Sequence, residues 1–243
     1  MTKRDITIDT GDGQCKAGVF KAGSGATAGV ILYMDAFGPR PALDAMAERL
    51  AASGYVVLVP DLFYRSGAYG PFDTKTAFND PATRDRIMGM MHAASHALTE
   101  RDGRSFIEAL TQEGASAKIG TVGYCMGGGR ALTAAAAYSD RVTGAASFHG
   151  GNLASDAADS PHLKAPMIKG RVYVGAAGED RSFPPEQSAK LDLALRTAGV
   201  DYTMENYIGM AHGWTVPDHG VFNAAGAERH WKRLLEFFDE TLH

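Results

Sequence analysis

At the centre of the sequence lies Gly123-Tyr124-Cys125-Met126-Gly127-Gly128, between a β-leaning segment at 118–122 and a run of small residues at 129–138 that predicts a helix. A strand, Gly-x-Cys-x-Gly and a helix together are typical of a nucleophile elbow. The glycines leave room for a sharp, strained turn beside the neighbouring elements. The partial positive charge at the start of the helix favours a thiolate. The pattern therefore predicts that Cys125 is a nucleophile, with a buried structural cysteine as the alternative.

Composition narrows the classes of protein to which the chain can belong. The chain has 243 residues, a formal net charge of −4, 45% apolar residues and no block of like charge. A nucleic acid or an anionic membrane is therefore not expected as a partner. The two cysteines form no disulfide framework, and the sequence shows neither an apolar signal region nor a run of transmembrane length. We therefore expect a cytoplasmic location.

Hydrophobic patterning predicts strands that alternate with helices. A hairpin is expected over 6–21, strands over 29–34, 55–60, 118–122, 143–149, 171–175 and 201–207, and helices over 42–53, 83–113 with a break near Gly103, 129–138, 185–198 and 224–242. This alternation is typical of an α/β fold, a mostly parallel sheet with helices on both faces. Because no linker or repeat interrupts the pattern, we expect a single domain over 1–243. The irregular, aromatic segment 61–80 is long enough to be a functional loop.

Reactive side chains follow several of the predicted strands. Because the carboxyl ends of parallel strands meet at one edge of the sheet, Asp35, Asp180 and His212 are expected near Cys125. The order nucleophile, acid, histidine is that of α/β-hydrolase triads. His212 would then move the thiol proton and Asp180 would hold the histidine tautomer. Glu179 is the rival for the acid role, and Asp180 could instead only cap the following helix.

Two backbone N–H groups are expected to form an oxyanion hole. One belongs to Met126, which directly follows the nucleophile. The other should come from the loop after the first buried strand, most simply from Ala36. Such donors stabilise the charge that develops on a carbonyl oxygen, so this pair predicts acyl-transfer chemistry.

Together these motifs resemble the dienelactone hydrolase family of the α/β-hydrolase fold. The matching stretches are 123–128, Phe148-His149-Gly150-Gly151, Asp180 before a proline-containing turn, Ala211-His212-Gly213, Asp35-Ala36-Phe37-Gly38 and Pro60-Asp61-Leu62-Phe63. The resemblance extends over most of the chain, from about Ile6 to Phe238. It implies a Cys-Asp-His hydrolase that acts on lactones or small carboxylic esters through a thioester acyl-enzyme, with no cofactor. The expected partner is accordingly a small-molecule substrate, and the oligomeric state is left open.

The chain departs from the family pattern at two positions. The family has a glutamate that holds the resting thiol where this chain has the shorter Asp35, which could contact the thiol or only satisfy loop amides. An arginine of the family that binds the substrate carboxylate is replaced by Val216. A less basic, more aromatic pocket is therefore expected, and its candidate residues are Phe37, Phe63, Tyr64, Arg84 and Trp214.

Other classes of protein fit the sequence less well. A glutamine amidotransferase would have glutamate where this chain has Trp214. A non-catalytic ligand-binding protein on the same fold would leave the ordered triad unexplained. A redox sensor would need a resolving cysteine, and Cys15 lies on a distant edge strand. His92 and His96 have helical spacing, but without a third ligand nearby we expect a solvated helix face and no metal site.

Overall fold

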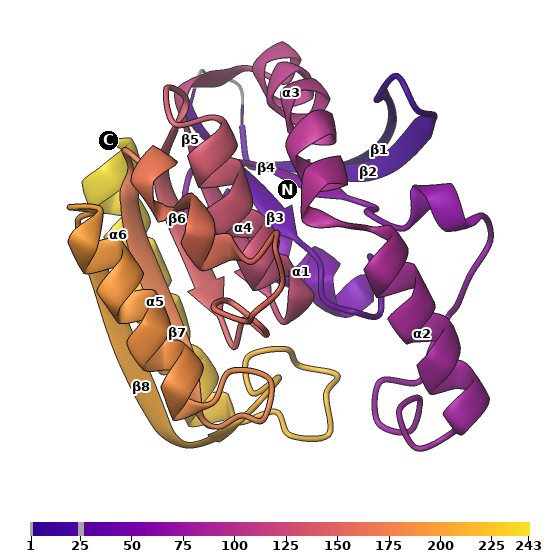
Figure 1. Cartoon of the computed structure of the whole chain (residues 1–243). Coiled ribbons are helices and arrows are strands. Elements are labelled where there is room, and N and C mark those ends of the chain that lie inside the picture. The colour runs from indigo at the N-terminus through magenta and orange to yellow at the C-terminus, as the bar shows by residue number, and fades with distance from the viewer. Residues whose placement is uncertain (1, 24–26) are drawn as a thin grey trace.

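The computed structural model describes residues 2–23 and 27–243, which contain one eight-stranded sheet (Figure 1). The order across the sheet is β1-β2-β4-β3-β5-β6-β7-β8. The strands are β1 (Thr2–Asp9), β2 (Gln14–Lys21), β3 (Thr27–Tyr33), β4 (Val56–Pro60), β5 (Ala115–Tyr124), β6 (Val142–Phe148), β7 (Arg171–Glu179) and β8 (Tyr202–Ala211). All the predicted strands are therefore present.

One strand, β2, runs in the direction opposite to all the others. The hairpin β1–β2 is antiparallel and pairs Ile8 with Cys15, and β2 also runs antiparallel to β4. From β4 through β3 and on to β8 every neighbouring pair is parallel. The prediction of a mostly parallel sheet is confirmed, and the carboxyl ends of β3, β5, β7 and β8 consequently meet at one edge.

Helices cover both faces of the sheet, as predicted. They are α1 (Pro41–Ala52), α2 (Pro81–Ala93), α3 (His96–Gln112), α4 (Met126–Ala137), α5 (Pro185–Thr197) and α6 (Ala224–Leu242). Helices α1 and α6 lie on one face and α3, α4 and α5 on the other, whereas α2 projects from the body (Figure 1). The large buried side chains, among them Phe20, Phe106 and Phe238, fill the space between these helices and the sheet.

The prediction for 83–113 is wrong in one respect, because the chain breaks at Ala94-Ser95 and not near Gly103. The Ser95 hydroxyl accepts a hydrogen bond from the N–H of Leu98, which starts α3. Gly103 instead lies inside α3, where a β-carbon would stand 2.5 Å from the ring of Tyr138. His92 and His96 therefore belong to different helices, and only His92 is exposed. The predicted solvated face is wrong for His96, whose Nδ1 lies 2.8 Å from the hydroxyl of Thr133.

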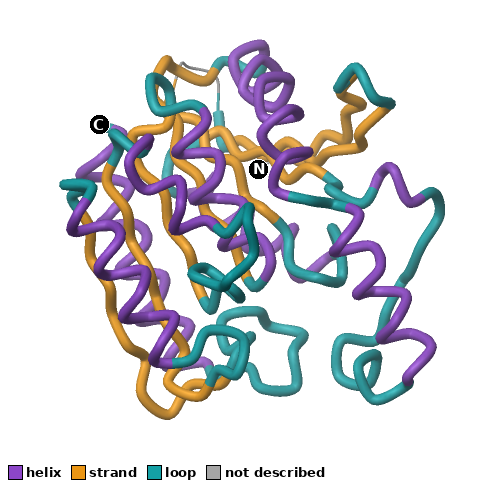
Figure 2. The backbone as a smooth tube through the Cα atoms, in the orientation of Figure 1, coloured by secondary structure: helices purple, strands orange, loops and turns teal. Residues whose placement is uncertain are grey.

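Loops gather along the edge where the parallel strands end. Figure 2 shows the loops that follow β6, β7 and β8 close together at the lower side of the molecule. The segments at 35–40, 149–160, 180–184 and 212–223 therefore surround the start of α4. Within 2–23 and 27–243, no helix has the length and apolar character needed to cross a bilayer.

Candidate active site

Cys125 occupies a strained turn between β5 and α4. Its φ angle is +56°, a value that costs energy for any residue other than glycine. The turn is held by backbone bonds, since the N–H of Cys125 reaches the carbonyl of Phe148 at 3.3 Å and its carbonyl accepts from Gly128 at 3.1 Å. The strand, turn and helix around the half-buried cysteine therefore match the predicted elbow.

A buried histidine completes the support of this turn. The N–H of Cys125 also donates to Nδ1 of His149 at 3.1 Å, so Nδ1 carries no proton. Nε2 of His149 therefore carries the proton and donates to the hydroxyl of Thr215 at 2.8 Å. Burial, reinforced by the charges of neighbouring histidines, holds the pKa of His149 well below its ordinary value. This neutral ring has a supporting role that sequence reasoning did not assign.

The glycines of the elbow allow α4 to lie close to the end of β3. A β-carbon on Gly127 would stand 2.3 Å from the carbonyl oxygen of Tyr33. This close approach brings the first turn of α4 beside the loop that begins at Asp35. Met126 is the first residue of α4, so its N–H has no partner within the helix. In that loop the N–H of Phe37 is already bonded to Asp35 at 3.0 Å, so the N–H of Ala36 stays the candidate for the second donor.

Asp180 and His212 are brought together from two strand ends. Nδ1 of His212 donates to Oδ2 of Asp180 at 2.7 Å. The other carboxylate oxygen accepts from the N–H and the hydroxyl of Ser182, at 2.8 and 2.6 Å. The Asp180 side chain is almost fully buried, and these bonds outweigh its burial and keep its pKa below the ordinary value. Ser182 was not predicted, although an aspartate two residues before a serine is the sequence signal of an Asx turn.

The remaining nitrogen of His212, Nε2, is free to meet Cys125. Burial lowers the pKa of His212, but the charge and hydrogen bond of the Cys125 sulfur and the bond to Asp180 outweigh it and raise this pKa to about 10. At neutral pH the ring is therefore an imidazolium that lies beside the sulfur. The candidate base therefore lies beside the candidate nucleophile.

Asp35 lies at the expected strand end but has other partners. Its carboxylate is completely buried and pairs with the guanidinium of Arg40 at 2.7 and 2.8 Å. It also accepts from Nε2 of His219 at 3.0 Å and from the N–H of Phe37. Burial raises the pKa of Asp35, but these donors outweigh it and lower the pKa below its ordinary value. Of the two expectations for Asp35, the contact with loop amides is the one that these bonds favour.

The five candidate pocket residues do not line one cavity. Phe37 packs edge-on against Phe78 with 5.4 Å between ring centroids, beside the loop after β3. Phe63 is buried, and Trp214 is fully buried between His149 and Tyr207. The burial of these two rings argues against their prediction as pocket residues.

The other two candidates point elsewhere. The hydroxyl of Tyr64 lies 2.6 Å from that of Thr10 in the β1–β2 hairpin. Arg84 is exposed on α2 and bonds to its neighbour Asp85. Neither contact lies at the end of β5, β7 or β8, so these residues do not converge with the candidate triad.

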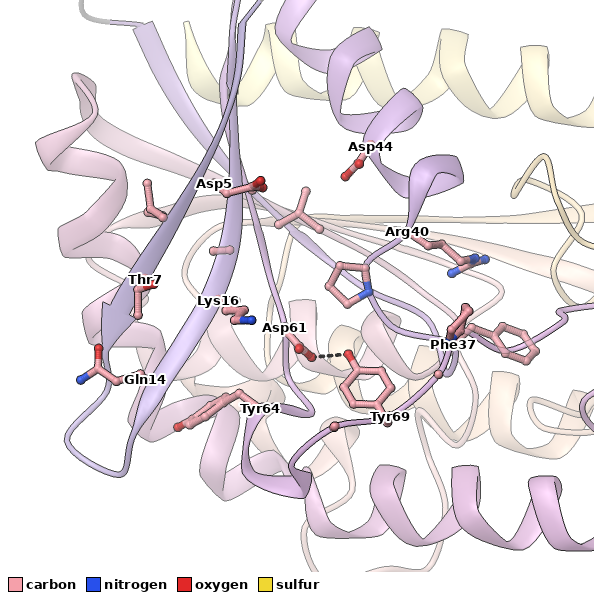
Figure 3. Close-up of a pocket in the computed structure, with 18 of the residues that line it drawn as sticks. Asp5, Thr7, Gln14, Lys16, Phe37, Arg40, Asp44, Asp61, Tyr64 and Tyr69 are labelled. Carbon is pink, nitrogen blue, oxygen red and sulfur yellow. Dashed lines mark hydrogen bonds between the residues drawn. The ribbon is translucent and has the colours of Figure 1, made fainter.

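A large cavity lies beside the β1–β2 hairpin. It has a volume of about 880 Å³ and opens between the β1–β2 hairpin, the start of α1 and segment 67–72 (Figure 3). Asp61 and Tyr69 are bonded at 2.5 Å inside it, and Phe37 and Arg40 form its far wall. Because none of the triad candidates lines this groove, its size alone does not locate the chemistry.

Known proteins that resemble this chain identify its family. The dienelactone hydrolase family matches residues 17–242, which is most of the chain. The chain belongs to the dienelactone hydrolase family. Carboxymethylenebutenolidase of Rhodococcus opacus is 28% identical over 228 residues, which cover 90% of this chain and 83% of that protein.

Two solved structures have a similar fold. A dienelactone hydrolase-like promiscuous phosphotriesterase from metagenomic libraries has a TM-score of 0.82 at 24% identity, and the match covers 100% of this chain and 99% of that one. The dienelactone hydrolase of Anabaena variabilis has a TM-score of 0.68 at 18% identity, and the match covers 100% and 99% of the two chains. The chain is therefore a hydrolase of the α/β-hydrolase fold, as the sequence predicted.

The two histidines with helical spacing, His92 and His96, do not form part of a metal-binding cluster in the described ranges. Across the described ranges, no three side chains of His, Cys, Asp or Glu are grouped so that they could hold a metal ion. His96 bonds to Thr133, and His92 is exposed on the other helix.

Proposed function

We propose that this enzyme hydrolyses lactones or small carboxylic esters by nucleophilic catalysis at Cys125. The observation that carries the proposal is the position of His212, whose ring is bonded to Asp180 through Nδ1 and to the Cys125 sulfur on its other side. A nucleophile, a base and a group that orients the base are the parts that such catalysis needs.

In the first half of the reaction the Cys125 thiolate attacks the carbonyl carbon of the ester. The carbonyl π electrons move to the oxygen, and the N–H groups of Met126 and Ala36 would stabilise the oxyanion. When the carbonyl re-forms, the C–O bond to the alcohol breaks and the leaving oxygen takes the proton from Nε2 of His212. The products are a free alcohol and a thioester on Cys125, or a single ring-opened thioester when the substrate is a lactone.

In the second half, water hydrolyses the thioester. His212, now neutral, accepts a proton from the attacking water, and Asp180 stabilises the imidazolium that forms. Collapse of the second tetrahedral intermediate breaks the C–S bond and releases the carboxylic acid. The thiolate and the imidazolium are thereby restored, and each cycle consumes one water molecule.

The test is hydrolysis of p-nitrophenyl acetate by the wild type and by Cys125→Ala. We expect the variant to lose activity and Cys125→Ser to keep a small, measurable rate, because the base and the oxyanion donors remain. Cys15→Ala is the matched control, since Cys15 is buried on β2 and its thiol bonds to the carbonyl of Asp61. Circular dichroism should show that all the variants are folded. Equal rates for the wild type and Cys125→Ala would reject the nucleophile and favour a ligand-binding role for this site.

A further inference from the structure

A network of charged side chains connects Asp35 to the loop that carries His212. Arg40 donates to both oxygens of Asp35, at 2.7 and 2.8 Å, and to both oxygens of Asp218, at 2.7 and 2.9 Å. Its side chain is only 12% exposed, and that of Asp35 is fully buried. Two bidentate pairs on one guanidinium form a rigid link, because the planar fork fixes both carboxylates. The link joins the loop after β3 to the loop after β8.

His219 extends this network to the backbone beside His212. Its Nε2 donates to Asp35 at 3.0 Å. The opposite side of the ring lies against Gly213, where a β-carbon would stand 2.4 Å from Nδ1 of His219. Gly213 directly follows His212 and has a φ angle of +101°. A single ring therefore connects the Asp35 carboxylate to the peptide next to His212.

The same network holds a third loop. The hydroxyl of Thr74 donates to the carbonyl of Asp218 at 2.6 Å, which fixes part of segment 61–80. Phe37 lies edge-on to His219, with 5.4 Å between ring centroids, and packs against Phe78 of the same segment. We call Asp35, Arg40, Asp218 and His219 the loop clamp. It joins the loop of the candidate oxyanion donor, the loop of His212 and segment 61–80.

We propose that Asp35, Arg40 and His219 are positioning residues, which fix the loop of His212 so that its ring meets the Cys125 sulfur. In this chain Asp35 then acts through the clamp and not on the thiol. The hydrogen bonds of its carboxylate within the described chain come from Phe37, Arg40 and His219, which lie in the loops after β3 and β8. The inference rests on the proposed function for the role of His212.

The test measures alkylation of Cys125 by iodoacetamide as a function of pH, which needs no ester substrate. The groups that face His212 are Asp180, Ser182, the Cys125 sulfur and neutral His149. If the clamp positions the ring, Asp35→Asn and Arg40→Lys should both move the alkylation profile to higher pH, because a displaced imidazolium stabilises the thiolate less. If Asp35 instead acted directly on the thiol, Asp35→Asn would give the opposite result. Loss of the negative charge would favour the thiolate and move the profile to lower pH.

Kinetics with p-nitrophenyl acetate provide a second readout. Asp35→Asn and Arg40→Lys should each lower kcat about tenfold and leave KM within about twofold, because a displaced base affects the transition state and not substrate binding. The double variant Asp35→Asn/Arg40→Lys should be no slower than the slower of the two single variants, because both substitutions disrupt the same ion pair. His219→Gln can keep the donor to Asp35 and should retain most of the activity that His219→Ala loses.

Arg49→Lys is the matched control. Arg49 makes a bidentate pair with Glu228 at 2.6 and 2.7 Å, which joins α1 to α6 away from the three loops. It should leave the alkylation profile and kcat unchanged.

The proposal is overturned if Arg40→Lys behaves like Arg49→Lys, or if Asp35→Asn alone shifts the profile and shifts it to lower pH. If Asp35→Asn does not fold, Arg40→Lys and the two His219 variants still decide the question. A protein that hydrolyses no ester but shows these alkylation shifts would reject the proposed function and keep the clamp.

Discussion

At Asp180 a single carboxylate faces both a histidine and a serine, whereas its neighbour Glu179 is exposed. We therefore predict different results for two variants that differ by one position. Asp180→Asn should lower kcat by about 10³-fold or more, because an amide cannot hold the imidazolium or its tautomer. Glu179→Gln should leave kcat unchanged. The measurement is the steady-state rate with p-nitrophenyl acetate, and a larger loss in Glu179→Gln would transfer the acid role to Glu179.

Ser182 should make a smaller contribution at the same carboxylate. Ser182→Ala removes the hydroxyl at 2.6 Å from Asp180 but keeps the backbone N–H at 2.8 Å. A hydrogen bond to a charged group is worth about 1.5–3 kcal/mol, so we expect kcat to fall by about ten- to 150-fold. The pKa of His212 should also fall from about 10, because Asp180 would be held less firmly. Titration of the His212 ring by NMR would measure this change, and an unaltered titration would show that the serine is dispensable.

The position of each residue in the sequence explains why one part of this site could be predicted and another could not. Cys125, Asp180 and His212 follow their strands directly in the sequence, so strand ends were sufficient to locate them. The loop clamp could not be located in this way, because Asp218 and His219 are more than 180 positions from Asp35 and their loop has no periodic pattern. Trp214 was misjudged for a related reason: an aromatic residue in a loop can pack against distant segments, and here its ring is fully buried between His149 and Tyr207.

Among the elements, α4 and its approach to β3 control the geometry of the elbow. We predict that Gly127→Ala destabilises the protein by about 3 kcal/mol, because its new β-carbon would meet backbone and not a flexible side chain. Gly89→Ala is the control, since Gly89 is exposed on α2 with no atom within 4 Å of the added carbon. This change should stabilise the protein by about 0.5–1 kcal/mol through helix propensity. Urea unfolding monitored by circular dichroism measures both, and equal stabilities would show that the close approach is not required.

Element boundaries show how far the sequence determines the fold. Apolar runs located the central strands, such as β3 and β4, because a strand covered on both faces needs them. The break between α2 and α3 was misplaced because glycine usually weakens a helix. At Gly103 the nearby ring of Tyr138 leaves no room for a larger residue, so tertiary packing overrides the local preference. The true boundary depends on the Ser95 cap, a local signal that the sequence does contain.

For the whole molecule, buried histidines should control stability in acid. His149 and His230 have no exposed surface. Both ring nitrogens of His230 have partners. Nε2 lies 3.0 Å from the hydroxyl of Tyr124, and Nδ1 lies 3.2 Å from the carbonyl of Ala227. Burial lowers the pKa of His230 to about 3, although the carbonyl of Ala227 works in the opposite direction. Both rings are therefore neutral in the folded protein at pH values where the unfolded chain binds protons.

The protonation of these histidines in the folded and unfolded states determines how the free energy of unfolding changes with pH. Below about pH 6.5 the unfolded chain protonates each histidine and the folded protein does not, so stability falls as the pH is lowered. For each fully buried ring, the free energy of unfolding should fall by about 1.4 kcal/mol for every unit by which the pH is lowered, until the pH reaches the pKa of that ring in the folded protein. The lowered pKa values of Asp35 and Asp180 act only at a lower pH, below the ordinary aspartate range near about 3.9.

We therefore predict that the free energy of unfolding decreases steeply between pH 6 and pH 4.5, and that His230→Asn reduces this slope by about 1.4 kcal/mol per pH unit. Asparagine keeps a donor for the carbonyl of Ala227 but takes up no proton in this range. Its loss of the contact with Tyr124 lowers stability equally at every pH, so the slope separates the two effects. His92→Asn, at an exposed position on α2, should leave the slope unchanged. Urea unfolding at four pH values provides the measurement, and equal slopes for His230→Asn and the wild type would contradict the argument.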